Sequence, residues 1–156
     1  MNYLNVLNFG IKALKKKKFE SNNLDSELLL SKVLKIPREK ILINLEKKIN
    51  YKKFEKYKKL IQRRIRNEPV AYILKKKEFW KNTFFINKDV LIPRPETELI
   101  VEETLKIIDH KKSKRILDVG TGSGCLIISL IKERPMISGK AIDISKKAIK
   151  IAKYNA

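Results

Sequence analysis

The fold of the chain is decided by residues 115–125, RILDVGTGSGC. The segment 115–119 has the apolar character of a short buried strand, and a loop with three glycines follows it at once. The other elements expected around it are a helix at Cys125–Ile131, a strand at Gly139–Ile142 and a helix at Lys146–Asn155, which Ser145 can cap. This order of strand, helix, strand and helix is the beginning of a doubly wound parallel sheet.

The loop after the first strand has the residue types of a nucleoside site. Ligands bind beyond the carboxyl ends of parallel strands, where glycine lets a ligand approach the backbone and a helix start offers unpaired N–H groups. Asp143 ends the second strand, 19 residues after Gly124, and a carboxylate there can bind the hydroxyls of a ribose. We therefore expect a pocket for a nucleoside.

The same loop differs from the common phosphate-binding patterns. From Asp118 to Gly124 it has the form D-x-G-x-G-x-G, whereas the dinucleotide pattern is G-x-G-x-x-G. No Gly-Lys-Ser or Gly-Lys-Thr follows, which excludes a P-loop. The Asp118 carboxylate disfavours a pyrophosphate and suits a ligand with a cationic end, such as the amino acid part of S-adenosylmethionine (AdoMet). The alternative is a glycine-rich turn with a structural aspartate.

The first 78 residues predict a small helical bundle with a basic surface. Apolar residues recur at helical spacing in four segments, and helices are expected at about 4–18, 22–34, 37–45 and 51–67. Asn22 or Asn23 is expected to cap the second helix, and Pro69 to follow the end of the fourth. Tyr57 and Ile61 are expected in the buried stripe of that fourth helix.

Residues 79–95 predict a β-hairpin that links two domains. Aromatic and β-branched residues are concentrated between Phe79 and Ile92, with turns expected at Asn82 and at Asn87–Asp89. Trp80 is expected to pack within this hairpin.

A proline-flanked arginine follows the hairpin. Prolines on both sides of Arg94 hold the backbone extended, and a stiff loop of this kind can present Arg94, Glu96 and Thr97 to a pocket. Thr97 is also expected to cap the next helix, Leu99–Ile108.

Composition excludes several classes of protein. Cys125 is the only cysteine of the 156 residues, so an internal disulfide framework and a multi-cysteine zinc site are excluded, and Cys125 is expected to be a packing residue. No apolar run approaches the ~20 residues of a membrane helix. His110 is expected in a solvated loop. The simplest expectation is a cytoplasmic protein with no membrane partner and no metal.

The net charge of +20 leaves two explanations open. Residues 1–78 carry +14 of it, which would suit an anionic partner. The basic residues are 30 Lys and only 7 Arg, although Arg binds oxyanions with a better-matched geometry. This ratio favours an excess of Lys on solvated faces.

Several segments of the sequence carry a family resemblance. They are EPVAYIL at 68–74, EF at 78–79, VLIPRPETE at 90–98 and ILDVGTGSGC at 116–125, together with DSELLL at 25–30. These segments resemble the HemK/PrmC family, class I methyltransferases that modify the glutamine of the Gly-Gly-Gln motif in peptide chain release factors. One departure is Lys75, where the family usually has glycine, and a lysine there is expected to give a different turn before Glu78.

The resemblance implies a fold, a cofactor and a set of site residues. The fold would be a small N-terminal α-helical bundle that docks the release factor (1–78), a β-hairpin linker (79–95) and the start of a class I, Rossmann-like α/β methyltransferase domain (96–156). AdoMet would be bound by Asp118, Gly120, Thr121, Gly122, Ser123, Gly124, Asp143 and Thr97. Arg94 and Glu96 would lie on a substrate loop. We expect a monomer whose partners are release factors.

The family's catalytic Asn-Pro-Pro-Tyr motif is absent, since no Asn-Pro pair occurs in the sequence. No catalytic residue is therefore assigned, and we expect the chain to be an N-terminal fragment or a truncated product. Its two parallel strands would then leave apolar side chains exposed, at Ile116, Leu117, Val119, Ile142 and Ile144. Two other functions stay open: a nucleic-acid amino methyltransferase, and a non-catalytic basic helical binding module.

Overall fold

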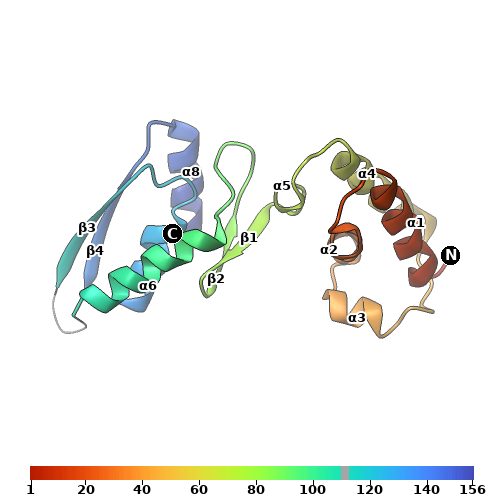
Figure 1. Ribbon diagram of the computed structural model, residues 1–156, viewed down its shortest axis with the longest axis horizontal. Helices are drawn as coiled ribbons and strands as arrows, with labels where there is room; N and C mark the ends of the chain where they lie inside the picture. Colours follow the sequence, from red (N-terminus) through yellow and green to blue (C-terminus); the bar gives the residue numbers. More distant parts are fainter. Residues whose placement is uncertain (110–112) are drawn as a thin grey trace. The chain divides into compact units, whose positions relative to one another are not determined.

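The computed structural model of the chain describes residues 1–109 and 113–156 (Figure 1). His110 lies outside these residues. The chain divides into two compact units, Met1–Leu74 and Lys75–Ala156. This division comes four residues before the expected end of the first domain, because the hairpin begins at Lys76 and belongs to the second unit.

The first unit is a helical bundle. Its helices are α1 (Tyr3–Lys16), α2 (Asn22–Leu34), α3 (Arg38–Leu42), α4 (Tyr51–Ile65) and α5 (Val70–Leu74). The four expected helices are confirmed, whereas the five-residue α5 is too short to show a helical period in the sequence. The expected asparagine cap of α2 is wrong: Ser21 holds the cap position, and the Asn22 side chain instead donates to the carbonyl of Phe19 at 2.8 Å.

The core of this bundle joins α1, α2 and α4. Tyr57 and Ile61 are fully buried, as expected for the α4 stripe. A largely buried ion pair connects α4 to α2, with 2.7 Å between Arg64 Nε and Asp25 Oδ2. The Arg64 guanidinium also lies 3.8 Å from the centre of the Phe19 ring. Arg64 is therefore paired with an acid and stacked on an aromatic ring, and it is not available to an anionic partner.

The second unit holds two small sheets and three longer helices. Its elements are β1 (Lys76–Phe79), β2 (Asn82–Phe85), η1 (Pro95–Thr97), α6 (Glu98–Ile107), β3 (Lys114–Val119), α7 (Cys125–Glu133), β4 (Ile137–Ile142) and α8 (Lys146–Asn155). Strands β1 and β2 are antiparallel, and β3 and β4 are parallel. The expected strand–helix–strand–helix order is confirmed, and each bound lies within two residues of its predicted place.

The hairpin closes earlier than the sequence predicted. Phe79 pairs with Asn82, so the turn consists of Trp80 and Lys81, and Asn82 is already part of β2. The strand expected at 90–92 is wrong: Val90 is buried and lies in a bend, and Leu91 and Ile92 lie in irregular structure. A proline follows this segment, and proline cannot donate to a sheet ladder.

Trp80 ties the hairpin turn to two helices. Its φ of 53° is in the left-handed region, which is unfavourable for a side chain of this size. Its backbone N–H donates to Glu98 Oε1 at 2.6 Å, and its indole N–H donates to Glu133 Oε1 at 2.8 Å. The ammonium of Lys81 and then the Trp80 indole hold the pKa of Glu133 below its usual range. The half-buried Trp80 thus joins β1 to α6 and α7.

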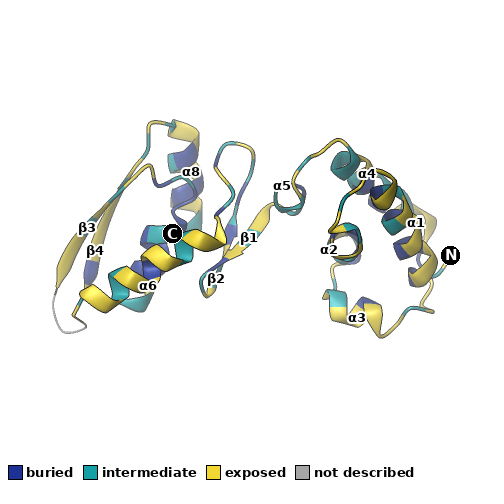
Figure 2. Cartoon of the chain, in the orientation of Figure 1, coloured by how far each residue is buried: buried dark blue, intermediate teal, exposed yellow. Residues whose placement is uncertain are grey.

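The β3–β4 pair has one covered and one bare face. Helices α6, α7 and α8 lie on one side of it in Figure 1. Successive side chains of a strand point to opposite faces, and those facing away from the helices are exposed: Leu117 by 58% and Val119 by 71%. Figure 2 shows this exposure along both strands. The expected exposure is confirmed for Leu117, Val119, Ile142 and Ile144, while Ile116 is half-buried.

Lys75 connects α5 to β1 in a conformation that glycine adopts without strain. Its φ is 60°, in the left-handed region. The lysine thus takes a conformation that favours glycine, and the expectation that it gives a different turn before Glu78 stays a prediction.

Replacing Lys75 by glycine should therefore stabilise the chain. A left-handed residue with a Cβ costs about 1–2 kcal/mol, and part of this gain is offset because glycine has more freedom in the unfolded chain. We expect Lys75→Gly to raise the free energy of unfolding by about 1 kcal/mol in urea titrations. Lys76→Gly, one residue later in β1, is the control and should lower it. An unchanged or lower urea midpoint for Lys75→Gly would contradict the conclusion that Lys75 is strained.

Candidate functional site

The parallel register brings the ends of β3 and β4 together. Val119 pairs with Ile142, so the loop after β3 and the Asp143 that follows β4 meet at one edge of the sheet. The N–H groups of Gly120 and Thr121 both donate to the Ile142 carbonyl, at 2.9 and 3.0 Å. The loop is thus fixed to the end of the neighbouring strand.

Asp143 holds the loop through its carboxylate. Oδ2 accepts from the N–H of Gly122 at 2.9 Å, and Oδ1 accepts from the N–H of Ser145 at 2.8 Å. The bond from Ser145 and then the bond from Gly122 lower the pKa of Asp143. An ionised carboxylate has about four acceptor positions, so two remain for ligand hydroxyl groups. Binding of a ribose at Asp143 stays a prediction that this geometry permits.

Asp118 lies on the other side of the same loop. Its Oδ2 accepts from the Thr121 hydroxyl at 2.7 Å, and Thr121 is buried while Asp118 is half-buried. The carboxylate therefore keeps a fixed orientation and still has acceptor capacity for a cationic group. Thr121 contributes by orienting Asp118, since its own hydroxyl is already used.

The three loop glycines do two different things. All have positive φ, 77° at Gly120, 56° at Gly122 and 80° at Gly124. A Cβ at Gly120 or Gly122 would meet no atom within 4 Å, so both face open space. A Cβ at Gly124 would lie 2.8 Å from Ile128 Cδ1 and 3.2 Å from Ala152 Cβ. The first two leave room for a ligand, and the third packs the loop on α7 and α8.

The side chains of Ser123 and Cys125 are buried in the interior. Their exposed fractions are 2% and 9%, so the Ser123 side chain cannot face a ligand and only its backbone can. Burial raises the pKa of the Cys125 thiol, an effect that a hydrogen bond with Ser123 partly offsets. Cys125 is therefore a packing residue, as expected, and not an activated nucleophile.

The proline-flanked segment differs from the prediction at one point, the cap of α6. Arg94 and Glu96 are exposed, and within the described part of the chain no hydrogen bond or ion pair joins their side chains to the glycine loop. Thr97 does not cap α6: its backbone is helical (φ −69°, ψ −19°), and its side chain makes no capping bond. The cause is the 3₁₀ helix η1, which runs directly into α6. Thr97 is therefore helical, whereas a capping residue has an extended backbone. Roles of Arg94, Glu96 and Thr97 toward a ligand stay predictions.

Asn155 is the residue of this site that the sequence did not reveal. Its side chain in the last turn of α8 hydrogen-bonds both the loop carbonyl of Ser123 and the backbone of Phe85 in β2. Its sequence neighbours do not predict this, because the partners are 32 and 70 residues away. The only sequence signal is a polar residue at the end of an otherwise regular amphipathic helix.

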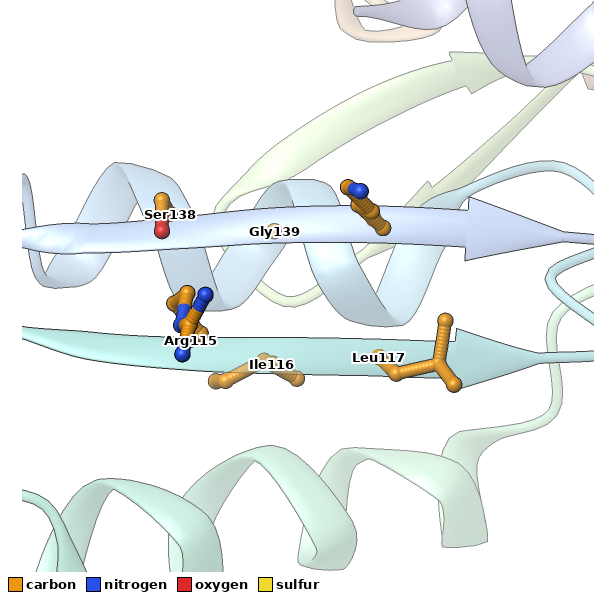
Figure 3. Close-up of a pocket in the computed structure, with 6 residues that line it drawn as sticks. Arg115, Ile116, Leu117, Ser138 and Gly139 are labelled. Atoms are coloured by element: carbon orange, nitrogen blue, oxygen red, sulfur yellow. The ribbon is translucent and has the colours of Figure 1, made fainter.

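A hollow of about 340 Å³ is lined by the middle parts of β3 and β4 (Figure 3). Its lining residues are Arg115, Ile116, Leu117, Ser138, Gly139 and Lys140. It lies away from the carboxyl ends of the strands and contains no acid, so it offers none of the features of the loop site. Among the described residues, no group of three His, Cys, Asp or Glu could hold a metal ion, and no helix is long and apolar enough to cross a membrane.

Comparison with known proteins assigns the two units separately. The family model of the PrmC N-terminal domain matches residues 5–74, and that of the Methyltransferase small domain matches residues 97–156. A release factor glutamine methyltransferase of Leptospira interrogans serovar Lai is 41% identical over 156 residues, covering 98% of this chain and 54% of the relative. The chain belongs to the HemK/PrmC family.

Further relatives agree with the HemK/PrmC assignment. A release factor glutamine methyltransferase of Coxiella burnetii is 44% identical over 133 residues, covering 85% of this chain and 48% of the relative. A protein named bifunctional methyltransferase from Rickettsia felis is 36% identical over 178 residues, covering 97% of this chain and 34% of the relative. The chain thus spans about half the length of the release factor methyltransferases that it matches.

The division of roles among the glycines predicts different costs of substitution. Gly120→Ala adds only the left-handed strain of about 1–2 kcal/mol. Gly124→Ala adds the same strain and a clash with α7 and α8, for which overpacking costs about 1–3 kcal/mol more. Trp80 is the only tryptophan and lies in the second unit, so its fluorescence during urea unfolding reports the difference. Equal destabilisation by the two variants would contradict the assignment.

Proposed function

We propose that this chain supplies the cofactor-binding part of an AdoMet-dependent methyltransferase that N5-methylates the glutamine of the Gly-Gly-Gln motif of peptide chain release factors. The observation that carries the proposal is the hydrogen bond from the Gly122 N–H to Asp143, in a loop whose first two glycines face open space. In a HemK/PrmC chain, this arrangement favours a nucleoside cofactor. The β3–β4 pair with its helices would be the start of a Rossmann-like class I domain.

The residues present fit the chemical parts of AdoMet. Asp143 has acceptor capacity for the ribose hydroxyls, and Asp118 has a carboxylate for the ammonium of the methionine part. The space before Gly120 and Gly122 lets the cofactor approach the backbone. When bound, AdoMet supplies a methyl group on a positively charged sulfur, which is transferred to the amide nitrogen of the substrate.

The contribution of this chain to the transfer would be positional. Holding two reactants in the correct geometry lowers the barrier of a bimolecular step by several kcal/mol, roughly 7–11 at the upper end. The chain contains no Asn-Pro pair, so we place the group that holds the substrate amide outside these 156 residues. Asp118 and Asp143 would bind and orient the cofactor and take no part in proton transfer.

The helical unit would dock the protein substrate. This part of the proposal rests on the match of residues 5–74 to the PrmC N-terminal domain and on the names of the relatives. A cytoplasmic location follows from such a substrate. One observation favours a nucleic-acid amino methyltransferase instead: residues 1–78 carry +14 of the net charge. The high ratio of Lys to Arg and the helical unit itself favour the protein substrate.

AdoMet binding tests the cofactor site directly. Calorimetry should show binding to the wild-type chain and a loss of at least about 100-fold in Asp143→Ala, because hydrogen bonds to a charged group contribute about 1.5–3 kcal/mol each. Since the pKa of Asp143 is lowered, binding should persist as the pH falls from 7 to about 5. The matched control is Asp89→Ala, which removes a nearby acid 3.6 Å from Lys147 and should leave the affinity unchanged. Equal affinity in the wild type and Asp143→Ala would refute the site.

The substrate class is tested by the partner that the chain binds. We expect a labelled release factor to bind the 156-residue chain, and a deletion of residues 1–74 to abolish this binding. An RNA duplex and a DNA duplex of similar mass serve as competitors. Binding of RNA or DNA that is stronger than that of the release factor at 150 mM salt would favour the nucleic-acid alternative. Salt titration separates nucleic-acid binding from release factor binding, because contacts to phosphates weaken steeply as the salt concentration rises.

A further inference from the structure

The carboxamide of Asn155 joins three segments that are distant in sequence. Its Oδ1 accepts from the N–H of Phe85 at 2.8 Å, while its Nδ2 donates to the carbonyl of Phe85 at 3.0 Å and to that of Ser123 at 2.8 Å. Both N–H donors of the amide are therefore used, and one side chain holds β2, the glycine loop and α8 together.

The two bonds to Phe85 follow from the geometry of the hairpin. Backbone groups of successive residues in a strand point to opposite sides, and the N–H of Ile86 points toward β1, where it donates to the carbonyl of Lys75 at 3.3 Å. The N–H and C=O of Phe85 therefore point outward, to the open side of β2. An asparagine side chain has the donor and acceptor of a peptide group and pairs with Phe85 as a further strand would. The ring of Tyr154, 5.0 Å from the Phe85 ring, packs beside this contact.

The third bond fixes one peptide plane of the glycine loop. The carbonyl of Ser123 accepts from Asn155, and the N–H of Gly124 on the same peptide unit donates to the carbonyl of Thr121 at 2.8 Å. The N–H of Gly122, two residues earlier, donates to Asp143. Two side chains therefore hold the loop, Asp143 from before the start of α8 and Asn155 from its last turn.

We infer that Asn155 is a positioning residue for the AdoMet loop, which couples the orientation of the Ser123–Gly124 peptide to the β1–β2 hairpin. The inference rests on the proposed cofactor site for its functional meaning. Among the described residues, the hydrogen bond from Asn155 to the loop goes to the Ser123 carbonyl, so Asn155 acts on the ligand through the backbone and not by contact. A change at Asn155 is expected to reach the loop even though the residue lies outside the sequence motif.

The test uses the full ¹⁵N-labelled chain with two substitutions and a matched control. Asn155→Asp removes both donors and places a negative charge beside two carbonyl oxygens, while Asn155→Leu keeps the size and removes every hydrogen bond. Tyr154→Leu is the control, because it removes the ring contact with Phe85 and leaves the bond to Ser123. The readouts are the amide shifts and hydrogen exchange of Gly122, Ser123 and Gly124, together with the AdoMet affinity. Unchanged Trp80 fluorescence and unchanged amides of residues 1–74 show that the variants are folded.

We expect both Asn155 variants to shift and deprotect the loop amides and to weaken AdoMet binding about tenfold, which is about 1.4 kcal/mol. Tyr154→Leu should leave the loop amides and the affinity as in the wild type. Loop amides that stay unchanged in both Asn155 variants, or that change equally in Tyr154→Leu, would overturn the inference. A wild-type chain that does not bind AdoMet would refute the proposed cofactor site instead, and the loop amides would still decide the role of Asn155.

Discussion

The site depends on one constraint, the parallel register that sets Val119 opposite Ile142. Because of it, the carbonyl of Ile142 accepts two loop amides, and Asp143 comes within hydrogen-bonding distance of Gly122. A shift by one residue would turn Asp118 to the other face of the sheet and move Asp143 away from Gly122. The geometry of the loop is thus a consequence of strand pairing more than of the loop sequence itself.

The helices in the first unit are kept in place by a different kind of interaction. Arg64 and Asp25 form a largely buried ion pair. Loss of one partner would leave a buried charge without its counterion and would strongly destabilise the fold. Two further basic residues of this unit form more exposed pairs, Lys58 with Glu55 and Arg63 with Glu68. The net charge already subtracts these acids, so the +14 of residues 1–78 is carried by basic residues outside such pairs.

Features with local causes were predictable from the sequence, and features with distant causes were not. The cap of α8 by Ser145 could be predicted because donor and acceptor are three residues apart. The β3–α7–β4–α8 order followed from apolar runs and glycines. The prediction of the second hairpin strand failed because β-branched residues also occur at Val90 and Ile92, and the pairing of Phe79 with Asn82 is what selects the strand. Thr97 failed as a cap because η1 continues into α6, and Asn155 could not be found because its partners come from β2 and the loop.

The contacts of Trp80 have a consequence for how the family can change over time. One tryptophan at a strained turn donates a hydrogen bond to an acid at the start of α6 and another to an acid at the end of α7. Loss of the indole would leave Glu133 with Lys81 alone, and loss of Glu98 would leave the turn amide without its acceptor. Substitutions at positions 80, 98 and 133 should therefore arise together among relatives, as one inherited set, although 53 residues separate the first from the last.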